Sequence, residues 1–275
     1  MASVTLKQAA GMAYREAIPE AASDLDPVLC VHGFPQSSYV WRHLLPALAD
    51  SGRAAYAPDL HGYGDSEPDR PGTWECHMES LEAFRREIGL EQVVLVVHDW
   101  GGLIGLRWAC DHPDAVGALV IGNTGFFPDA EWHALAKALQ TEGQGETLID
   151  SFSREGLEAA LSGLGSTFDE DALDQYWKAF ESEDRRRSIL DLYRSGDLAK
   201  LEPYRGRLAA LEVPTLILWG GGEQEYTPEE GARSFLEMIP GASLVVVDDA
   251  GHFVFEAEPQ RCVREVVGFL DGAGV

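Results

Sequence analysis

The stretch that decides the fold reads Val93-Val94-Leu95-Val96-Val97-His98-Asp99-Trp100-Gly101-Gly102. Its unbroken run of apolar, strand-forming residues is typical of a strand that is buried in a parallel sheet. An apolar segment from Leu103 to Ala109 follows at once and has the character of a helix, so the chain must reverse within a few residues at the two glycines. We expect this strand, turn and helix to present a carboxylate, Asp99, at the bend.

Composition limits the classes of partner and the number of domains. The 275 residues, 45% of them apolar, suffice for one substantial core. A net charge of −25, from 46 acidic and 21 basic residues, argues against nucleic acid and membrane surfaces as partners. The N-terminus lacks a secretory signal pattern and no apolar run could span a bilayer, so we expect a cytoplasmic protein. Nothing in the pattern assigns an oligomeric state.

The four cysteines indicate neither a disulfide framework nor a metal site. They are scattered without C-x-x-C spacing, and two of them lie in apolar runs, which is typical of small buried hydrophobic residues in a reducing compartment. We therefore expect no metal and no cofactor.

Strands alternate with helices through most of the chain, which predicts a mostly parallel sheet with right-handed crossovers. Between Phe126 and Gly206 the strand pattern is replaced by amphipathic helical segments with apolar residues at i, i+3, i+4 and i+7. We interpret residues 126–206 as a helical cap over the strand ends, inserted between core segments 1–125 and 207–275.

Three short stretches follow strands and carry polar residues suited to chemistry. They are His32-Gly33-Phe34-Pro35, Val97-His98-Asp99-Trp100-Gly101-Gly102 and Ala250-Gly251-His252-Phe253. Together they resemble the haloalkane dehalogenase and epoxide hydrolase branch of the α/β-hydrolase superfamily, whose chain order is nucleophile, acid, base. The resemblance covers nearly the whole core and weakens in the cap. It implies an α/β-hydrolase fold, with a mostly parallel central sheet flanked by helices and an inserted helical cap.

This resemblance implies a two-step hydrolysis of a small apolar organic substrate by water. A carboxylate is ionised at neutral pH, so Asp99 can attack a saturated carbon without a base and form an alkyl ester. His252 then deprotonates the water that attacks this ester. The backbone N–H groups of Trp100 and Phe34 are the expected donors to the oxyanion.

Halide as the leaving group would need N–H donors in an apolar pocket. The indole of Trp100 can supply one, worth about 1.5–3 kcal/mol for a charged acceptor. The side chain of Phe34 has no donor, so Trp132 or Trp177 would have to supply the second. Both tryptophans lie on apolar helical stripes, where packing is the competing interpretation.

An epoxide would instead need a phenol to protonate the alkoxide. The segment Leu192-Tyr193-Arg194 resembles the one that bears a cap tyrosine in epoxide hydrolases, and Tyr176 is the candidate for its partner, also on a packing stripe. One phenol activates an epoxide less than two, so we favour dehalogenation. The alternatives are an epoxide hydrolase with the same Asp99 and His252, or a binding protein or specialised-metabolism enzyme in which hydrolysis has been lost.

The triad acid is where the sequence departs from the family pattern. In the family an aspartate lies four residues after a tryptophan and four before a proline. Counted from Trp219 this position is Glu223, but counted back from Pro228 it is Gln224. Glutamine carries no charge, so we choose Glu223, with loss of the acid as the alternative. Asn123, where some relatives keep the acid, is also uncharged.

Overall fold

The computed structural model describes residues 2–164, 168–222 and 226–275. Its centre is an eight-stranded sheet in the order β1-β2-β4-β3-β5-β6-β7-β8. The first two strands form a hairpin and β2 runs antiparallel to β4, whereas all later neighbours are parallel. The fold class predicted from sequence is thereby confirmed. The strands are β1 (Val4–Ala9), β2 (Met12–Ala17), β3 (Val28–Val31), β4 (Ala55–Pro58), β5 (Val93–His98), β6 (Val116–Gly122), β7 (Thr215–Gly220) and β8 (Ser243–Val247).

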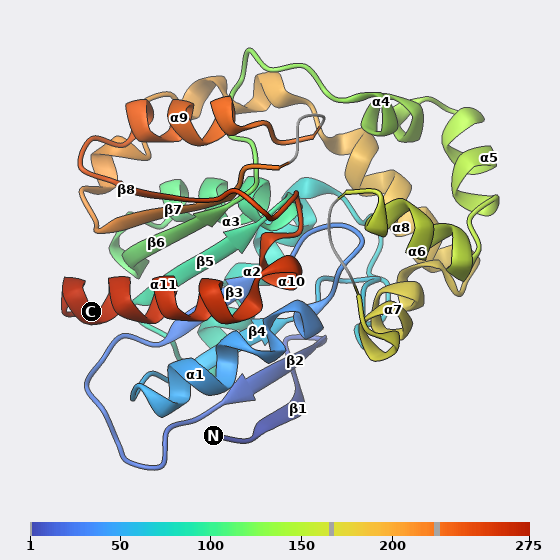
Figure 1. Ribbon diagram of the computed structural model, residues 1–275. Helices are drawn as coiled ribbons and strands as arrows, with labels where there is room; N and C mark the ends of the chain where they lie inside the picture. The colour runs from blue at the N-terminus through green and yellow to red at the C-terminus, as the bar shows by residue number, and fades with distance from the viewer. Residues whose placement is uncertain (1, 165–167, 223–225) are drawn as a thin grey trace.

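Helices cover both faces of the sheet (Figure 1). On one face α1 (Leu44–Asp50) packs against α11 (Pro259–Ala273), and on the other α2 (Trp74–Ile88) packs against α3 (Trp100–Asp111). A further helix, α9 (Glu229–Met238), packs on β7 and β8. Every residue of β3, β5 and β7 is buried, because these central strands are covered on both sides. No helix in the described part of the chain has the length and apolar character that crossing a membrane requires.

The turn from β5 into α3 depends on close backbone approach. A Cβ added to Gly101 would lie 2.2 Å from the carbonyl oxygen of Val31, and one added to Gly102 would lie 2.1 Å from Oγ1 of Thr124. Only glycine therefore lets α3 begin this close to β3 and to the end of β6. These close contacts fix the position of Asp99, the residue at the bend.

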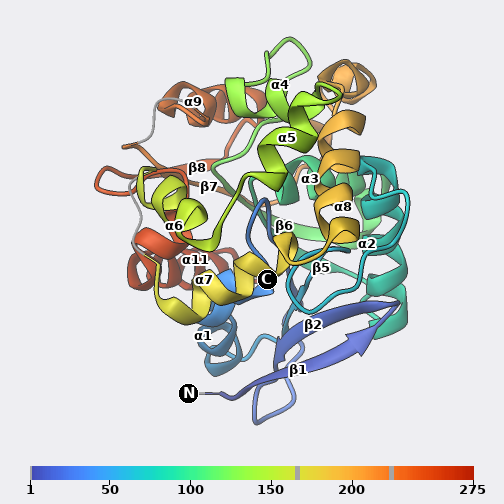
Figure 2. The ribbon, with the colours of Figure 1, turned by 90° about the vertical axis from the view of Figure 1, so that its right-hand side faces the viewer.

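Between Gly122 and Thr215 the described chain forms helices and loops without a strand. Its α-helices lie together beyond the ends of the central strands, not beside an outer strand (Figures 1 and 2). The ends of the predicted cap, residues 126 and 206, fall inside this segment and stay a prediction. The helices are α4 (Ala134–Gln140), α5 (Gln144–Asp150), α6 (Arg154–Ser162), α7 (Glu170–Trp177) and α8 (Glu183–Ser195).

Candidate active site

Asp99 stands at the bend between β5 and α3 with φ 51° and ψ −127°. A non-glycine residue in such a conformation costs on the order of 1–3 kcal/mol and persists only where its surroundings hold it. Here the backbone N–H of Asp99 donates to the Asn123 carbonyl at 3.1 Å, and the Thr124 hydroxyl donates to the Asp99 carbonyl at 2.6 Å. The side-chain Oδ1 accepts from the Phe34 backbone N–H at 2.7 Å. The carboxylate is therefore held in one place by its neighbours.

The electrostatics keep Asp99 ionised. Burial works to raise the pKa of Asp99, but the hydrogen bond and charge of His252, together with His98 and the Trp100 backbone N–H, lower it overall. A carboxylate with a lowered pKa is fully charged at neutral pH, so a separate base is not needed to make it nucleophilic.

His252 follows β8 and is buried beside Asp99. Its Nε2 lies 3.3 Å from Oδ2 of Asp99, and its Nδ1 lies 3.0 Å from Oγ1 of Thr227. The main chain of His252 is fixed by His98, whose Nε2–H donates to the His252 carbonyl at 2.8 Å. Burial and the nearby His252 ring lower the pKa of His98 to about 4, so His98 is neutral at pH 7 and braces the loop without adding charge.

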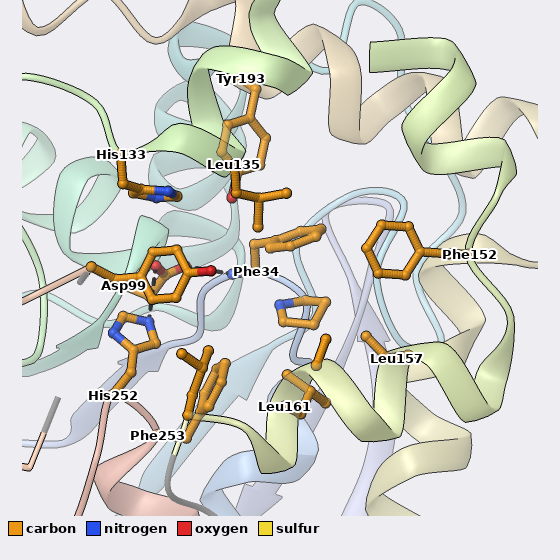
Figure 3. Close-up of a pocket in the computed structure, with 14 residues that line it drawn as sticks. Phe34, Asp99, His133, Leu135, Phe152, Leu157, Leu161, Tyr193, His252 and Phe253 are labelled. Carbon is orange, nitrogen blue, oxygen red and sulfur yellow. Dashed lines mark hydrogen bonds and ion pairs between the residues drawn. The ribbon is translucent and has the colours of Figure 1, made fainter. Parts of the chain in front are cut away.

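Asp99 and His252 lie at one end of a mostly apolar cavity (Figure 3). Phe152 and the α6 residues Leu157 and Leu161 lie toward its other end, in the cap. The cavity is thus formed between core and cap, where open α/β sheets bind ligands. Its lining residues are Phe34, Pro35, Asp99, His133, Leu135, Phe152, Leu157, Ala160, Leu161, Leu164, Tyr193, Tyr226, His252 and Phe253.

Tyr193 of α8 enters this cavity and contacts the aromatic residues around Asp99. Its ring packs edge-on against Phe34 and Trp100, with centroids 5.4 and 5.2 Å away. Burial raises the pKa of the Tyr193 phenol well above its ordinary value and the charge of Asp99 adds to this, although the Trp100 indole opposes it. Tyr193 therefore keeps its proton and can donate it in a hydrogen bond near Asp99.

Trp132 approaches the site, but its donor is already used. It stacks on Trp100 with centroids 5.2 Å apart, and both line a second hollow that also reaches Asp99. The indole N–H of Trp132 donates to the Gly196 carbonyl at 2.6 Å. The stacking holds Trp100 in place. The N–H of Trp132 is used within the cap and is not available to bind a leaving group.

Trp177 and Tyr176 are absent from the described lining of the cavity. Trp177 stacks on Phe180 with centroids 5.5 Å apart. Tyr176 is fully buried and donates to the Glu256 carboxylate, which also forms an ion pair with Arg42 at 2.8 Å. Trp177 thus packs within the cap and Tyr176 links cap and core, and a role for either in substrate binding stays a prediction.

Glu223 and Gln224, the two candidates for the triad acid, lie outside the described residues. Close to them in sequence, Thr227 contacts His252 through its hydroxyl. The sequence motif of this loop predicts only a carboxylate and therefore misses Thr227. Asn123 donates from Nδ2 to Oγ1 of Thr227 at 3.1 Å.

Tyr226 and His133 also line the cavity and were missed in the sequence. Their rings meet edge-on with centroids 4.4 Å apart, and Tyr226 lies 5.9 Å from the His252 ring. Neither belongs to a motif, so only the folded chain brings them to the site. Within residues 2–164, 168–222 and 226–275, no group of three His, Cys, Asp or Glu residues is arranged to hold a metal ion.

An acidic residue at the strand-to-helix bend, faced by a histidine that follows the last strand, stands at the positions of the nucleophile elbow and the histidine of the α/β-hydrolase fold. The family model for the alpha/beta hydrolase fold matches residues 26–259, and the chain belongs to this family. A haloalkane dehalogenase from Mycobacterium marinum is 34% identical over 269 residues, covering 92% of this chain and 87% of that protein.

Solved structures agree with this assignment. The crystal structure of a haloalkane dehalogenase from Bradyrhizobium elkani USDA94 is 27% identical, has a TM-score of 0.85 and is matched over 100% of this chain and 99% of that one. An epoxide hydrolase from an endophytic Streptomyces shares the fold, with a TM-score of 0.80 at 24% identity over 98% of this chain and 96% of that one. The protein is thus a hydrolase of the haloalkane dehalogenase and epoxide hydrolase branch.

Proposed function

We propose that the protein hydrolyses small, uncharged haloalkanes through an alkyl ester on Asp99. The observation that carries the proposal is the pairing of Asp99 Oδ2 with His252 Nε2 at 3.3 Å, at the end of an apolar cavity. The described residues that line this cavity include no Lys or Arg, so a carboxylate on the substrate would find no counter-charge there.

The two oxygens of Asp99 are held differently, and this suggests their roles. Oδ1 accepts the Phe34 N–H, whereas Oδ2 faces His252 and is suited to attack the substrate carbon. Attack forms the carbon–Oδ2 bond as the carbon–halogen bond breaks and halide leaves. Oδ1 is then the ester carbonyl oxygen, already bonded to an N–H group that can stabilise the oxyanion of the second step.

His252 serves the second step. Its Nε2 removes a proton from water as the water oxygen bonds to the carboxyl carbon of Asp99. The tetrahedral intermediate collapses, and the proton on His252 Nε2 passes to the leaving oxygen, so that the alcohol carries away the former Oδ2 and Asp99 keeps the oxygen of water. We further propose that Glu223 supplies the negative charge that supports the His252 imidazolium.

Halide would be received beside Trp100 and Tyr193. The Trp100 indole N–H donates a hydrogen bond to the Tyr193 phenol oxygen, so it would have to turn from this oxygen to the halide, while the phenol O–H is a second donor in the same apolar setting. This pair takes the place of the donors that Phe34 lacks and that Trp132 has committed to Gly196.

The Tyr193 phenol also favours a second candidate, epoxide hydrolysis with the same Asp99 and His252. A phenol that keeps its proton beside the nucleophile can protonate the alkoxide formed on ring opening. Halide release from a bromoalkane, compared with diol formation from styrene oxide, separates the two activities.

The covalent route is tested by removing the base. His252→Ala incubated with a bromoalkane, or with styrene oxide, should accumulate an adduct on Asp99 that intact-mass measurement and peptide mapping detect. His112→Ala, which changes a histidine at the end of α3, is the matched control and should show no adduct. In wild-type enzyme, one turnover in ¹⁸O-water should label Asp99. Label in the alcohol alone would rule the ester out.

A further inference from the structure

Thr227 lies on the loop between β7 and α9, and its side chain meets two residues of the site. Its Oγ1 is 3.0 Å from His252 Nδ1 and 3.1 Å from Asn123 Nδ2. Its main-chain carbonyl accepts the indole N–H of Trp219 at 3.0 Å, which anchors the residue to the end of β7. The hydroxyl is therefore held between the base and the end of β6.

The orientation of the Asn123 amide follows from its partners. The Gly220 backbone N–H lies 2.8 Å from one end of the amide, and because an N–H can only donate, that end must be the oxygen. The amide nitrogen then faces the Gly220 carbonyl at 3.2 Å and Oγ1 of Thr227. Asn123 is fully buried and so are its two hydrogen bonds to Gly220, whereas Thr227 is half-buried. Asn123 thus donates to the Thr227 hydroxyl oxygen and fixes its position.

The hydroxyl oxygen has a second lone pair, and Nδ1 of His252 lies within hydrogen-bond distance of it. A neutral imidazole can take a proton from water at Nε2 only if its own proton is on Nδ1. Once Asp99 is esterified, its negative charge no longer holds a proton on Nε2. An acceptor at Nδ1 then favours the tautomer that the second step needs, and it also accepts from the imidazolium that forms.

We propose that Thr227 is a positioning residue for His252. Its hydroxyl oxygen accepts a hydrogen bond from Nδ1–H, beside the negative charge proposed for Glu223, so that Nε2 is free to deprotonate water during hydrolysis of the ester. The inference rests on the proposed function and adds to it a contact that acts in the second step alone. Attack by Asp99 on the substrate requires no proton transfer by His252, so the first step does not depend on Thr227.

Thr227→Val removes the hydroxyl with little change in shape, and Thr227→Ser keeps it. Rapid-quench measurements with a bromoalkane separate halide release from alcohol release, and intact mass follows the adduct. For Thr227→Val we expect ester hydrolysis to slow by about 10- to 100-fold, because the buried Nδ1–H loses the hydrogen bond to the Thr227 oxygen. The adduct should accumulate, and halide release in the first turnover should stay within about threefold of wild type. Thr227→Ser should hydrolyse the ester at close to the wild-type rate.

Thr141→Val, which removes an exposed cap hydroxyl bonded to the Lys137 carbonyl, is the control and should leave both steps unchanged. The proposal is overturned if Thr227→Val hydrolyses the ester at the wild-type rate, if both steps slow equally, or if Thr227→Ser fails to restore hydrolysis. These results differ from failure of the proposed function, in which His252→Ala itself forms no adduct.

Discussion

Replacing Gly33 with alanine should displace Asp99, the proposed nucleophile, without unfolding the protein. A Cβ on Gly33 would lie 2.2 Å from Oδ1 and 2.4 Å from Cβ of Asp99, well inside the 3.0 Å that real Cβ atoms keep. Either the loop or the Asp99 side chain must then move by roughly 1 Å, and the 2.7 Å bond from the Phe34 N–H cannot keep its geometry. A displacement of this size at a reacting atom can cost about 100-fold in rate.

The assay is single-turnover halide release, which reports the attack by Asp99, together with thermal unfolding. We expect Gly33→Ala to slow attack by about 100-fold and to lower the free energy of unfolding by about 1–3 kcal/mol, as overpacking does. Gly125→Ala is the matched control, since a Cβ there meets no atom within 4 Å although Gly125 lines the neighbouring hollow. If Gly33→Ala attacks within about threefold of the wild-type rate, Asp99 is not held as described.

Three further predictions follow from the contacts of the site. Tyr193→Phe should slow epoxide opening by about 100-fold, within the range for a lost general acid, yet change the rate of bromide release by less than about tenfold. An equal fold-loss of rate on the two substrates would contradict the role of the phenol. Trp132→Phe should lower the free energy of unfolding by about 0.5–1.5 kcal/mol, because the bond to the Gly196 carbonyl is lost, while bromide affinity measured by fluorescence quenching stays unchanged. A marked loss of bromide affinity would show that this indole binds the halide after all. The folded state lowers the pKa of Asp99, so the carboxylate stabilises the fold above the ordinary aspartate pKa and loses this effect as pH falls through the lowered value. Because Asp99 stays ionised, the rate of attack in stopped-flow measurements should be constant down to about pH 5. A decline in this rate centred at about pH 6 would show that another group controls it.

The sequence predicts local features of the fold well because they depend on neighbouring residues. The apolar run before Asp99 and the glycines after it specify a strand, a bend and a helix, and the structure has all three. The pattern from Thr73 to Ile88 likewise predicts a helix that Gly89 closes, and α2 forms there, capped by the Thr73 hydroxyl and ended by Gly89 with φ 80°. In both cases the sequence signal and the structure have the same local cause.

The surroundings of the site are less predictable, because they depend on contacts between distant segments. The donor of Trp132 is used by Gly196, 64 residues away in the chain, and no local pattern announces that bond. Tyr226 and Thr227 are a phenol and a hydroxyl in a loop that the motif describes only by its acid. Their roles arise from the position of that loop against His252, which the sheet register sets.

The two oxygens of the Asp99 carboxylate are held by different partners, and these partners follow different strands of the sheet. The Phe34 N–H, after β3, holds Oδ1, while His252, after β8, faces Oδ2 and is steadied by Thr227 and Asn123 at the ends of β7 and β6. A change near Phe34 alters the nucleophile itself and so affects attack. A change near Thr227 alters only the base that frees the ester. The two chemical steps of the proposed reaction are therefore separable by mutation, because the loops that support the two oxygens of this carboxylate follow different strands on either side of β5.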